Sequence, residues 1–152
     1  MFHGVSALHL DAKGRMAVPS RYREKLLADG GNQVIVTLDP NGRCLLLYAM
    51  REWEQLEQTL VRLPNLDEGA YLLKHALLGH ATDCELDAQG RILLPAIPRS
   101  MVSVERQVAL VGMGNKFEIW DEAAWQARSA ACIRAVNAPG YTPPEALRNL
   151  VF

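Results

Sequence analysis

Runs of apolar residues in the first half of the chain predict four short strands. These runs alternate with polar residues or form short apolar blocks, and turn-forming residues bound them. The predicted strands are ALHLD (7–11), RMAVP (15–19), QVIVTL (33–38) and CLLLYA (44–49). The tight turn AKG joins the first two strands, and the turn DPNG joins the last two.

Two helices are predicted between and after these strands. The first covers 21–28, with Ser20 as its N-cap and the pair Gly30 and Gly31 as its end. The second, MREWEQLEQTLVRL (50–63), ends before a proline. Its large apolar side chains recur at helical spacing on one face: Trp53, Leu56, Leu60 and Leu63.

The second half of the chain repeats this order. It predicts a hairpin, two strands and a helix in turn, at 84–95, 107–112, 116–120 and 121–136. Asp121 is the expected cap of that helix. The segment 67–81 predicts a helix that connects the halves, and the proline-rich tail from Asn137 predicts loose structure with one short helix at 144–150.

A repeated motif marks the start of each half. DAKGRMAVPSRYR (11–23) and DAQGRILLPAIPR (87–99) share six of thirteen positions, where average residue usage gives about one by chance. Each copy has an arginine after the glycine, a proline four residues later and a second arginine four beyond that. An internal repeat of this kind indicates one structural unit used twice.

The two halves are expected to build one α+β fold together. Each half without its helix has about 45 residues, which is near the size below which a domain is rarely stable alone. Interleaving the strands of both halves into one small barrel is therefore favoured over two separate domains. The expected division is a first repeat, linking helices, a second repeat, and a C-terminal helix with its tail: 5–52, 53–80, 81–124 and 125–152.

Composition indicates an ordinary globular protein in a reducing compartment. Of the 152 residues, 49% are apolar and 22% are charged, and no apolar run approaches the ~20 residues that span a bilayer. The N-terminus lacks the pattern of a signal peptide. Three widely spaced cysteines, Cys44, Cys84 and Cys132, are expected to be buried free thiols. We therefore expect a cytoplasmic protein.

The charges are unevenly distributed although the net charge is only −1. Residues 1–27 carry five basic and two acidic side chains, whereas residues 39–73 carry three basic and six acidic ones. A chain of this kind can present one basic face to a polyanion. A merely solvated surface is the alternative.

Within the repeat, most residue types have a structural explanation. Asp11 and Asp87 are expected to accept backbone hydrogen bonds in their turns, and Gly14 and Gly90 to supply a positive φ. The arginines Arg15 and Arg91 have two interpretations. A guanidinium directly after a turn can reach a phosphate or a guanine edge, or it can pair with the aspartate of its own turn.

Other chemistry has little support in the sequence. His75, His80 and Cys84 resemble metal ligands, but five-residue spacing on a helix separates the histidine rings by about 140°. No catalytic or nucleotide-binding motif is found. We therefore expect no enzyme activity, cofactor, metal or small-molecule substrate.

Longer stretches of the chain resemble a known family. The first 27 residues, LLLY with EWEQLEQTLVRLP, LLGHATDCELDAQGRILLP and LVGMGNKFEIWDEAAW look like the bacterial MraZ family, from residue 1 to about 136. The paired D-x-x-G-R hairpins are similar to the AbrB/SpoVT DNA-binding fold, of which that family carries two copies.

The resemblance implies both an architecture and a function. The implied fold is a swapped-hairpin β-barrel that assembles into a ring. The implied function is sequence-specific binding of double-stranded promoter DNA at repeats, with repression of the protein's own operon, the division and cell wall gene cluster, at the nucleoid. The matching DNA-facing positions are Lys13, Arg15, Arg21, Arg23, Arg91 and Arg99.

Two questions remain open at this point. The second copy has AIPR where the first has SRYR, so the first copy is expected to contact DNA more strongly than the second. The alternative function is a ring-forming scaffold whose basic tips bind an acidic partner.

Overall fold

The computed structural model describes residues 1–28 and 30–151, and their contacts form two compact units. The first unit, Met1–Glu122, contains the strands and the repeated motifs. The second, from Ala123 onward, contains most of one helix and a 3-10 turn, and no residue of either element is buried. In the described part of the chain, no helix is both long and apolar enough to cross a bilayer.

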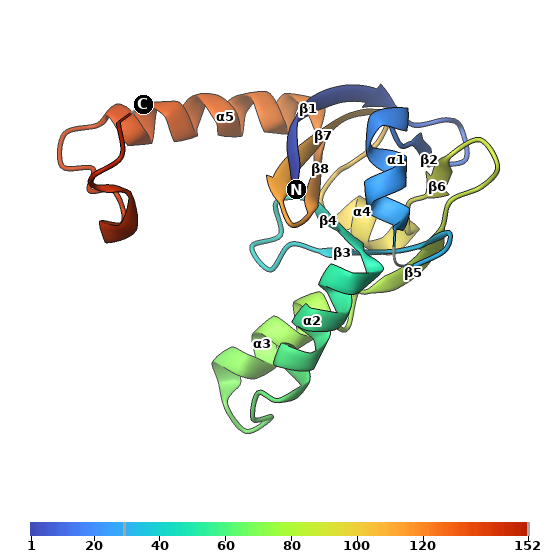
Figure 1. Cartoon of the computed structure of the whole chain (residues 1–152), viewed down its shortest axis with the longest axis horizontal. Helices are drawn as coiled ribbons and strands as arrows, with labels where there is room; N and C mark the ends of the chain where they lie inside the picture. The colour runs from blue at the N-terminus through green and yellow to red at the C-terminus, as the bar shows by residue number, and fades with distance from the viewer. Residues whose placement is uncertain (29, 152) are drawn as a thin grey trace. The chain divides into compact units, whose positions relative to one another are not determined.

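Apart from a helix at Ala96–Met101, which the sequence did not predict, the elements follow the expected order (Figure 1). The strands are β1 (Phe2–His9), β2 (Arg15–Ala17), β3 (Gln33–Leu38), β4 (Leu45–Ala49), β5 (Thr82–Glu85), β6 (Arg91–Leu93), β7 (Gln107–Gly114) and β8 (Phe117–Asp121). The helices are α1 (Ser20–Leu27), α2 (Met50–Val61), α3 (Glu68–Leu77), α4 (Ala96–Met101), α5 (Glu122–Asn137) and the 3-10 helix η1 (Glu145–Leu147).

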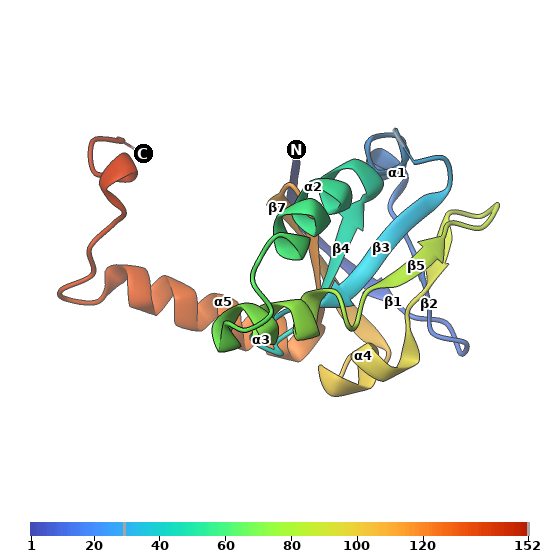
Figure 2. The same ribbon diagram turned by 90° about the horizontal axis from the view of Figure 1, so that it is seen from below.

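The two repeats exchange their first strands. Six strands form an antiparallel sheet in the order β1-β7-β8-β4-β3-β5, so β1 of the first repeat joins the β7–β8 hairpin of the second. In the same way, β5 of the second repeat joins the β3–β4 hairpin of the first (Figure 2). The ladder between β4 and β8 joins the two hairpins at the centre of the sheet. This exchange confirms the interleaved α+β fold predicted from the sequence.

A separate two-stranded ribbon completes the exchange. β2 and β6, the strands that follow the two repeated turns, pair antiparallel with Met16 opposite Ile92. Backbone hydrogen bonds extend the pairing at both ends, from Val18 N–H to Gly90 O at 2.9 Å and from Leu94 N–H to Gly14 O at 3.1 Å. Each repeat therefore donates one strand to a ribbon that neither could form alone.

One core lies under both the sheet and the ribbon. Its fully buried members come from both repeats and include Met16, Val18, Leu45, Leu47, Ile92, Leu110, Phe117 and Ile119. Leu10 and Leu86, the last apolar residues before the turns, are also buried, as the repeat predicts. Because the cluster contains side chains of both halves, the halves share a single hydrophobic core.

The helices begin and pack differently from one another. α1 and α4 each start directly after the repeat's proline, and Pro19 occupies the N-cap position of α1. The prediction that Ser20 caps α1 is therefore wrong, because Ser20 is already helical and makes no capping bond. α2 and α3 form a helical hairpin (Figure 1), with α3 capped by Asp67 and held to β3 by a bond from Thr37 Oγ1 to Leu77 O.

Candidate nucleic-acid interface

The aspartate of each repeat organises its turn, residues 11–15 or 87–91. Asp11 Oδ1 accepts the backbone N–H groups of Lys13 and Arg15 at 3.0 and 2.9 Å. Asp87 Oδ1 accepts those of Gln89 and Arg91 at 2.9 and 3.0 Å. The structural role predicted for both aspartates is confirmed, and the two turns have nearly the same geometry.

These hydrogen bonds make the stability contributed by the two turns depend on pH. The backbone N–H of Arg15 is the main cause that lowers the pKa of Asp11 below 3.8, and the N–H of Arg91 does the same for Asp87. Because the folded pKa is depressed, the stabilisation is present above about pH 3.8 and is lost as the pH falls through the folded pKa.

We expect Asp11→Asn/Asp87→Asn to lower the melting temperature at pH 7, because the amides lose the charge that the N–H groups and arginines stabilise. The difference from the unchanged protein should shrink as the pH falls below about 3.8. A melting series from pH 7 to pH 2.5 measures both curves. A difference in melting temperature that stays constant over this range would contradict a stabilising role for the ionised aspartates.

The first arginine of each repeat is tied to its own turn. Arg15 Nε donates to Asp11 Oδ2 at 2.6 Å, and Arg91 Nε donates to Asp87 Oδ2 at 2.9 Å. Arg91 Nη1 also lies 4.0 Å from Asp11 Oδ2. Arg91 Nη2 donates to Gln89 Oε1 at 3.4 Å as well, so Arg91 is engaged at more than its Nε atom. Among the described residues, no group accepts a bond from the Nη atoms of Arg15, so the same side chain can hold its turn and still offer donors outward.

The ribbon presents both arginines on its outer face. Met16 and Ile92 point into the core, so Arg15 and Ala17 on one strand and Arg91 and Leu93 on the other point away from it. The register pairs Arg15 with Leu93 and Ala17 with Arg91, which gives the ribbon an internal two-fold symmetry. The side chains of Arg15 and Arg91 are 30% and 31% exposed.

The second arginine of each repeat lies at the turn of the other repeat. The Arg23 guanidinium packs over Gly90, and the Arg99 guanidinium packs over Gly14. Arg23 Nε also donates to Val18 O at 2.7 Å. The structure therefore groups Arg15 with Arg99 and Arg91 with Arg23, whereas the repeated motif places Arg15 beside Arg23 and Arg91 beside Arg99 in the sequence.

The glycines of the turns are required both for backbone conformation and for this packing. Gly14 and Gly90 have φ values of 84° and 74°, and a Cβ at either position would overlap the guanidinium above it. We expect Gly14→Ala and Gly90→Ala each to lower the free energy of unfolding by about 1–2 kcal/mol. Urea denaturation measures this loss.

Gly42→Ala separates the two causes, because Gly42 has a φ of 68° and an added Cβ would meet no atom of the described residues within 4 Å. It should lose stability through backbone strain alone. Losses at Gly14 and Gly90 smaller than the loss at Gly42 would contradict a tight guanidinium contact.

The other two predicted DNA-facing residues lie in different surroundings. Lys13 is exposed at the tip of the first turn and shares a cavity with Arg99, Asp83 and Glu85. Arg21 lies on α1, where its guanidinium donates to Ser6 Oγ at 2.7 Å and stacks 4.5 Å from the centre of the Tyr22 ring. Arg21 is thus held against β1 and belongs to neither turn.

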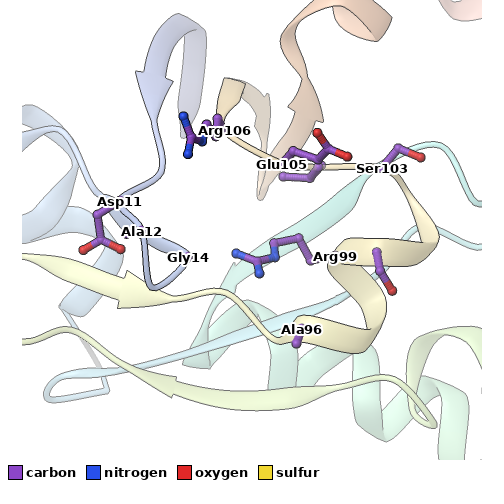
Figure 3. A pocket seen from close by; sticks show the side chains of 10 residues that line it. Asp11, Ala12, Gly14, Ala96, Arg99, Ser103, Glu105 and Arg106 are labelled. Atoms are coloured by element: carbon purple, nitrogen blue, oxygen red, sulfur yellow. The ribbon is translucent and has the colours of Figure 1, made fainter.

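A cavity beside the first turn contains a basic residue that the sequence analysis missed. Its volume is about 470 Å³, and Arg99, Ser103, Glu105 and Arg106 contribute to its walls with Asp11 and Gly14 (Figure 3). Arg106 precedes β7, outside the repeated motif, so the repeat offered no signal for it. Its backbone carbonyl accepts the N–H of Leu10 at 2.7 Å, which brings it to the base of the turn.

The cysteines and histidines of the described residues do not form a metal site. Cys44 and Cys84 are buried, and burial raises the pKa of Cys84 to about 11, so its thiol is protonated at neutral pH. Cys132 is exposed, so the prediction that it is buried is wrong. Within residues 1–28 and 30–151, no three histidine, cysteine or acidic side chains come together as metal ligands.

The histidine pair also differs from the sequence expectation. α3 ends at Leu77, and the following turn brings the ring of His80 to 5.8 Å from the ring of His75. The expected separation assumed one continuous helix and is wrong for that reason.

Comparison with known proteins places the whole fold in one family. The family model described as "MraZ protein, putative antitoxin-like" matches residues 1–74 and 77–138. The protein named Transcriptional regulator MraZ from Thioalkalivibrio sulfidiphilus is 52% identical over 125 residues, which are 82% of this chain and 83% of that protein. Proteins of the same name from Halorhodospira halophila and Pseudomonas fluorescens are 43% and 46% identical over the full length of both chains. The chain therefore belongs to the MraZ family.

Proposed function

We propose that this protein is a DNA-binding transcriptional regulator and that the β2–β6 ribbon with its two turns contacts the DNA. The observation that carries the proposal is the outer face of the ribbon, where Arg15 and Arg91 are held by aspartates at their Nε atoms. A two-stranded ribbon fits the major groove of B-DNA, and arginine binds guanine edges and phosphates with its Nη groups. The relatives named Transcriptional regulator support this function.

The finer proposal concerns the target and the place of action. We infer that the protein represses its own operon, the division and cell wall gene cluster, by binding repeats in the promoter. It would then act in the cytoplasm at the nucleoid, and the proposal gives it no catalytic role, cofactor or small-molecule substrate. The internal two-fold symmetry of the ribbon supports binding to a palindromic DNA site, in which the ribbon contacts bases on both sides of the centre.

A mobility-shift assay across a salt series tests the proposal. The probe is the upstream region of the protein's own operon, and the control is scrambled DNA of the same length. We expect tighter binding to the upstream region, with affinity that falls steeply as salt rises. Equal weak binding to both probes, together with binding to an acidic protein, would instead favour the scaffold function.

The proposed oligomer would raise affinity by tethering several ribbons. One subunit offers few base contacts, so simultaneous binding of spaced repeats increases the effective concentration. α2 buries Trp53 within the subunit against Tyr48, at 5.8 Å between ring centres. α3 instead exposes Tyr71, Leu72 and Leu73 by 50%, 58% and 43%, which supports α3 as the contact between copies.

We expect Leu72→Glu to reduce the mass of the assembly in light scattering at micromolar concentration, because a charge on an apolar contact is costly. The monomer should stay folded, since the side chain is exposed. Operator affinity should fall with the mass. An unchanged mass would remove α3 from the interface, and a monomeric unchanged protein with tight operator binding would overturn the oligomer itself.

A further inference from the structure

Two arginines face the cavity beside the first turn, residues 11–15. Arg99 reaches across toward Gly14, and Arg106 faces the same gap from the segment before β7 (Figure 3). Among the described residues, neither guanidinium forms an ion pair or donates a side-chain hydrogen bond. A pair of guanidinium groups on opposite walls of an open cavity is suited to an oxyanion, because each can donate two hydrogen bonds to it.

The acidic groups of the cavity are directed elsewhere. The Asp11 carboxylate is occupied by its own turn and by Arg15. The Glu105 carboxylate lies between Arg106 and Ser103 and points away from Gly14 (Figure 3). Asp83 and Glu85 line a different cavity, on the side of Arg99 that faces Lys13. Of the two acidic side chains that line this cavity, Asp11 is therefore engaged in its own turn and Glu105 points away from Gly14.

The second turn, residues 87–91, lacks this arrangement. Leu86 N–H bonds to Asn32 O at 2.9 Å, just as Leu10 N–H bonds to Arg106 O at 2.7 Å. Asn32 thus occupies in the first repeat the place that Arg106 occupies in the second, and both residues are exposed. Each turn has one arginine from the other repeat, Arg99 or Arg23, but only the first turn has an arginine at this further position.

We propose that Arg106, together with Arg99, binds a backbone phosphate of DNA beside the first turn. This proposal rests on the proposed function. It makes the two turns of one subunit unequal in phosphate contact although the ribbon between them is symmetric. One subunit would then be anchored to the DNA backbone at only one end of the ribbon.

Exchanging the two equivalent residues tests the proposal. Arg106→Asn gives the first turn the residue of the second, and Asn32→Arg gives the second turn the residue of the first. The operator affinity of both variants is measured by fluorescence anisotropy from 50 to 300 mM salt, with thermal melting as a check of folding. The control is Arg62→Asn, at an exposed arginine at the end of α2. It changes the net charge as Arg106→Asn does, but away from the turns.

A phosphate contact changes the salt dependence in a way that lost stability does not. We expect Arg106→Asn to reduce the slope of log affinity against log salt by about one and to weaken operator and scrambled DNA by the same factor. Asn32→Arg should increase the slope by about one, and Arg62→Asn should leave it unchanged. Glu105→Gln should strengthen binding, since it removes a negative charge from the cavity wall.

The outcomes separate this proposal from the function on which it rests. Steep salt-dependent operator binding with unchanged slopes in both exchange variants would overturn the Arg106 contact and leave the regulator function in place. Failure of the unchanged protein to bind DNA would overturn both. NMR titration with inorganic phosphate alone gives a further check: shifts at Arg106 combined with an unchanged DNA slope indicate a site for free anions and overturn the DNA contact.

Discussion

Replacing Phe117 with alanine is expected to lower the free energy of unfolding by about 3–5 kcal/mol. The Phe117 side chain on β8 is fully buried, and its ring centre lies 4.3 Å from that of Phe2 on β1 and 4.9 Å from that of Tyr22 on α1. It therefore joins the second repeat to the strand and helix of the first. Because domains of this size are stable by only about 5–15 kcal/mol, the loss should move the urea midpoint far toward zero.

Two variants make this expectation specific. Phe117→Leu keeps most of the volume and should cost much less than the alanine variant. Met113→Ala removes a side chain that is 50% exposed on the neighbouring strand β7 and should change stability by less than about 0.5 kcal/mol. A cost below about 1 kcal/mol for Phe117→Ala would mean that the two repeats do not depend on a shared core.

Local sequence signals predicted most of the elements. The strand over 33–38 and the turn DPNG match β3 and the observed bond from Gly42 N–H to Asp39 O. Their signals lie within the segments themselves: a short apolar run and a turn with a glycine of positive φ. The start of α1 was less well predicted, because a proline before the helix replaced the expected serine cap.

Strand pairing could be predicted only in outline. The repeat and its small size indicated that the halves interleave, which the exchange of β1 and β5 confirms. The partner of β2 did not follow from its own residues, since a three-residue strand after a tight turn is expected to pair with the strand before that turn. It pairs instead with β6, 76 positions further along the chain, because that pairing buries Met16 against Ile92 in the shared core.

The composition of the candidate site was predicted better than its arrangement. All six basic positions are found on the surface or at its edge, but Arg23 and Arg99 exchange turns and Arg21 lies on a separate part of α1. Closeness in the sequence does not predict which basic residues lie together, because the strand exchange brings residues of different repeats to the same turn. The same exchange places Asp83 and Glu85 of the second repeat in one cavity with Lys13 of the first.

This rearrangement changes the expected ranking of the two turns. The second repeat is expected from its sequence to contribute less, because it has AIPR where the first has SRYR. It also carries the acidic residues Asp83, Glu85 and Glu105. In the structure, Arg15 and Arg91 are related by the symmetry of the ribbon, are equally exposed, and make the same bond to their aspartates. Asp83, Glu85 and Glu105 line cavities beside the first turn. We therefore now predict similar contributions from the two ribbon arginines.

We expect Arg15→Ala and Arg91→Ala each to weaken operator binding by about 1–3 kcal/mol, with values that agree within roughly threefold in affinity. The double variant should lose roughly thirtyfold or more. The two losses need not add, because Arg91 Nη1 lies 4.0 Å from Asp11 Oδ2, the partner of Arg15. Anisotropy titrations of both single variants and the double variant at one fixed salt concentration measure these values.

Folding should be nearly unchanged in these variants, which makes the affinity loss interpretable. Removing Arg15 leaves Asp11 with both backbone N–H bonds, and an exposed ion pair contributes only about 0–1 kcal/mol. Arg62→Ala, at the exposed end of α2, is the matched control and should bind the operator normally. If Arg91→Ala binds as tightly as the unchanged protein while Arg15→Ala does not, only the first turn reads DNA. The two-fold symmetry of the ribbon would then serve the fold alone.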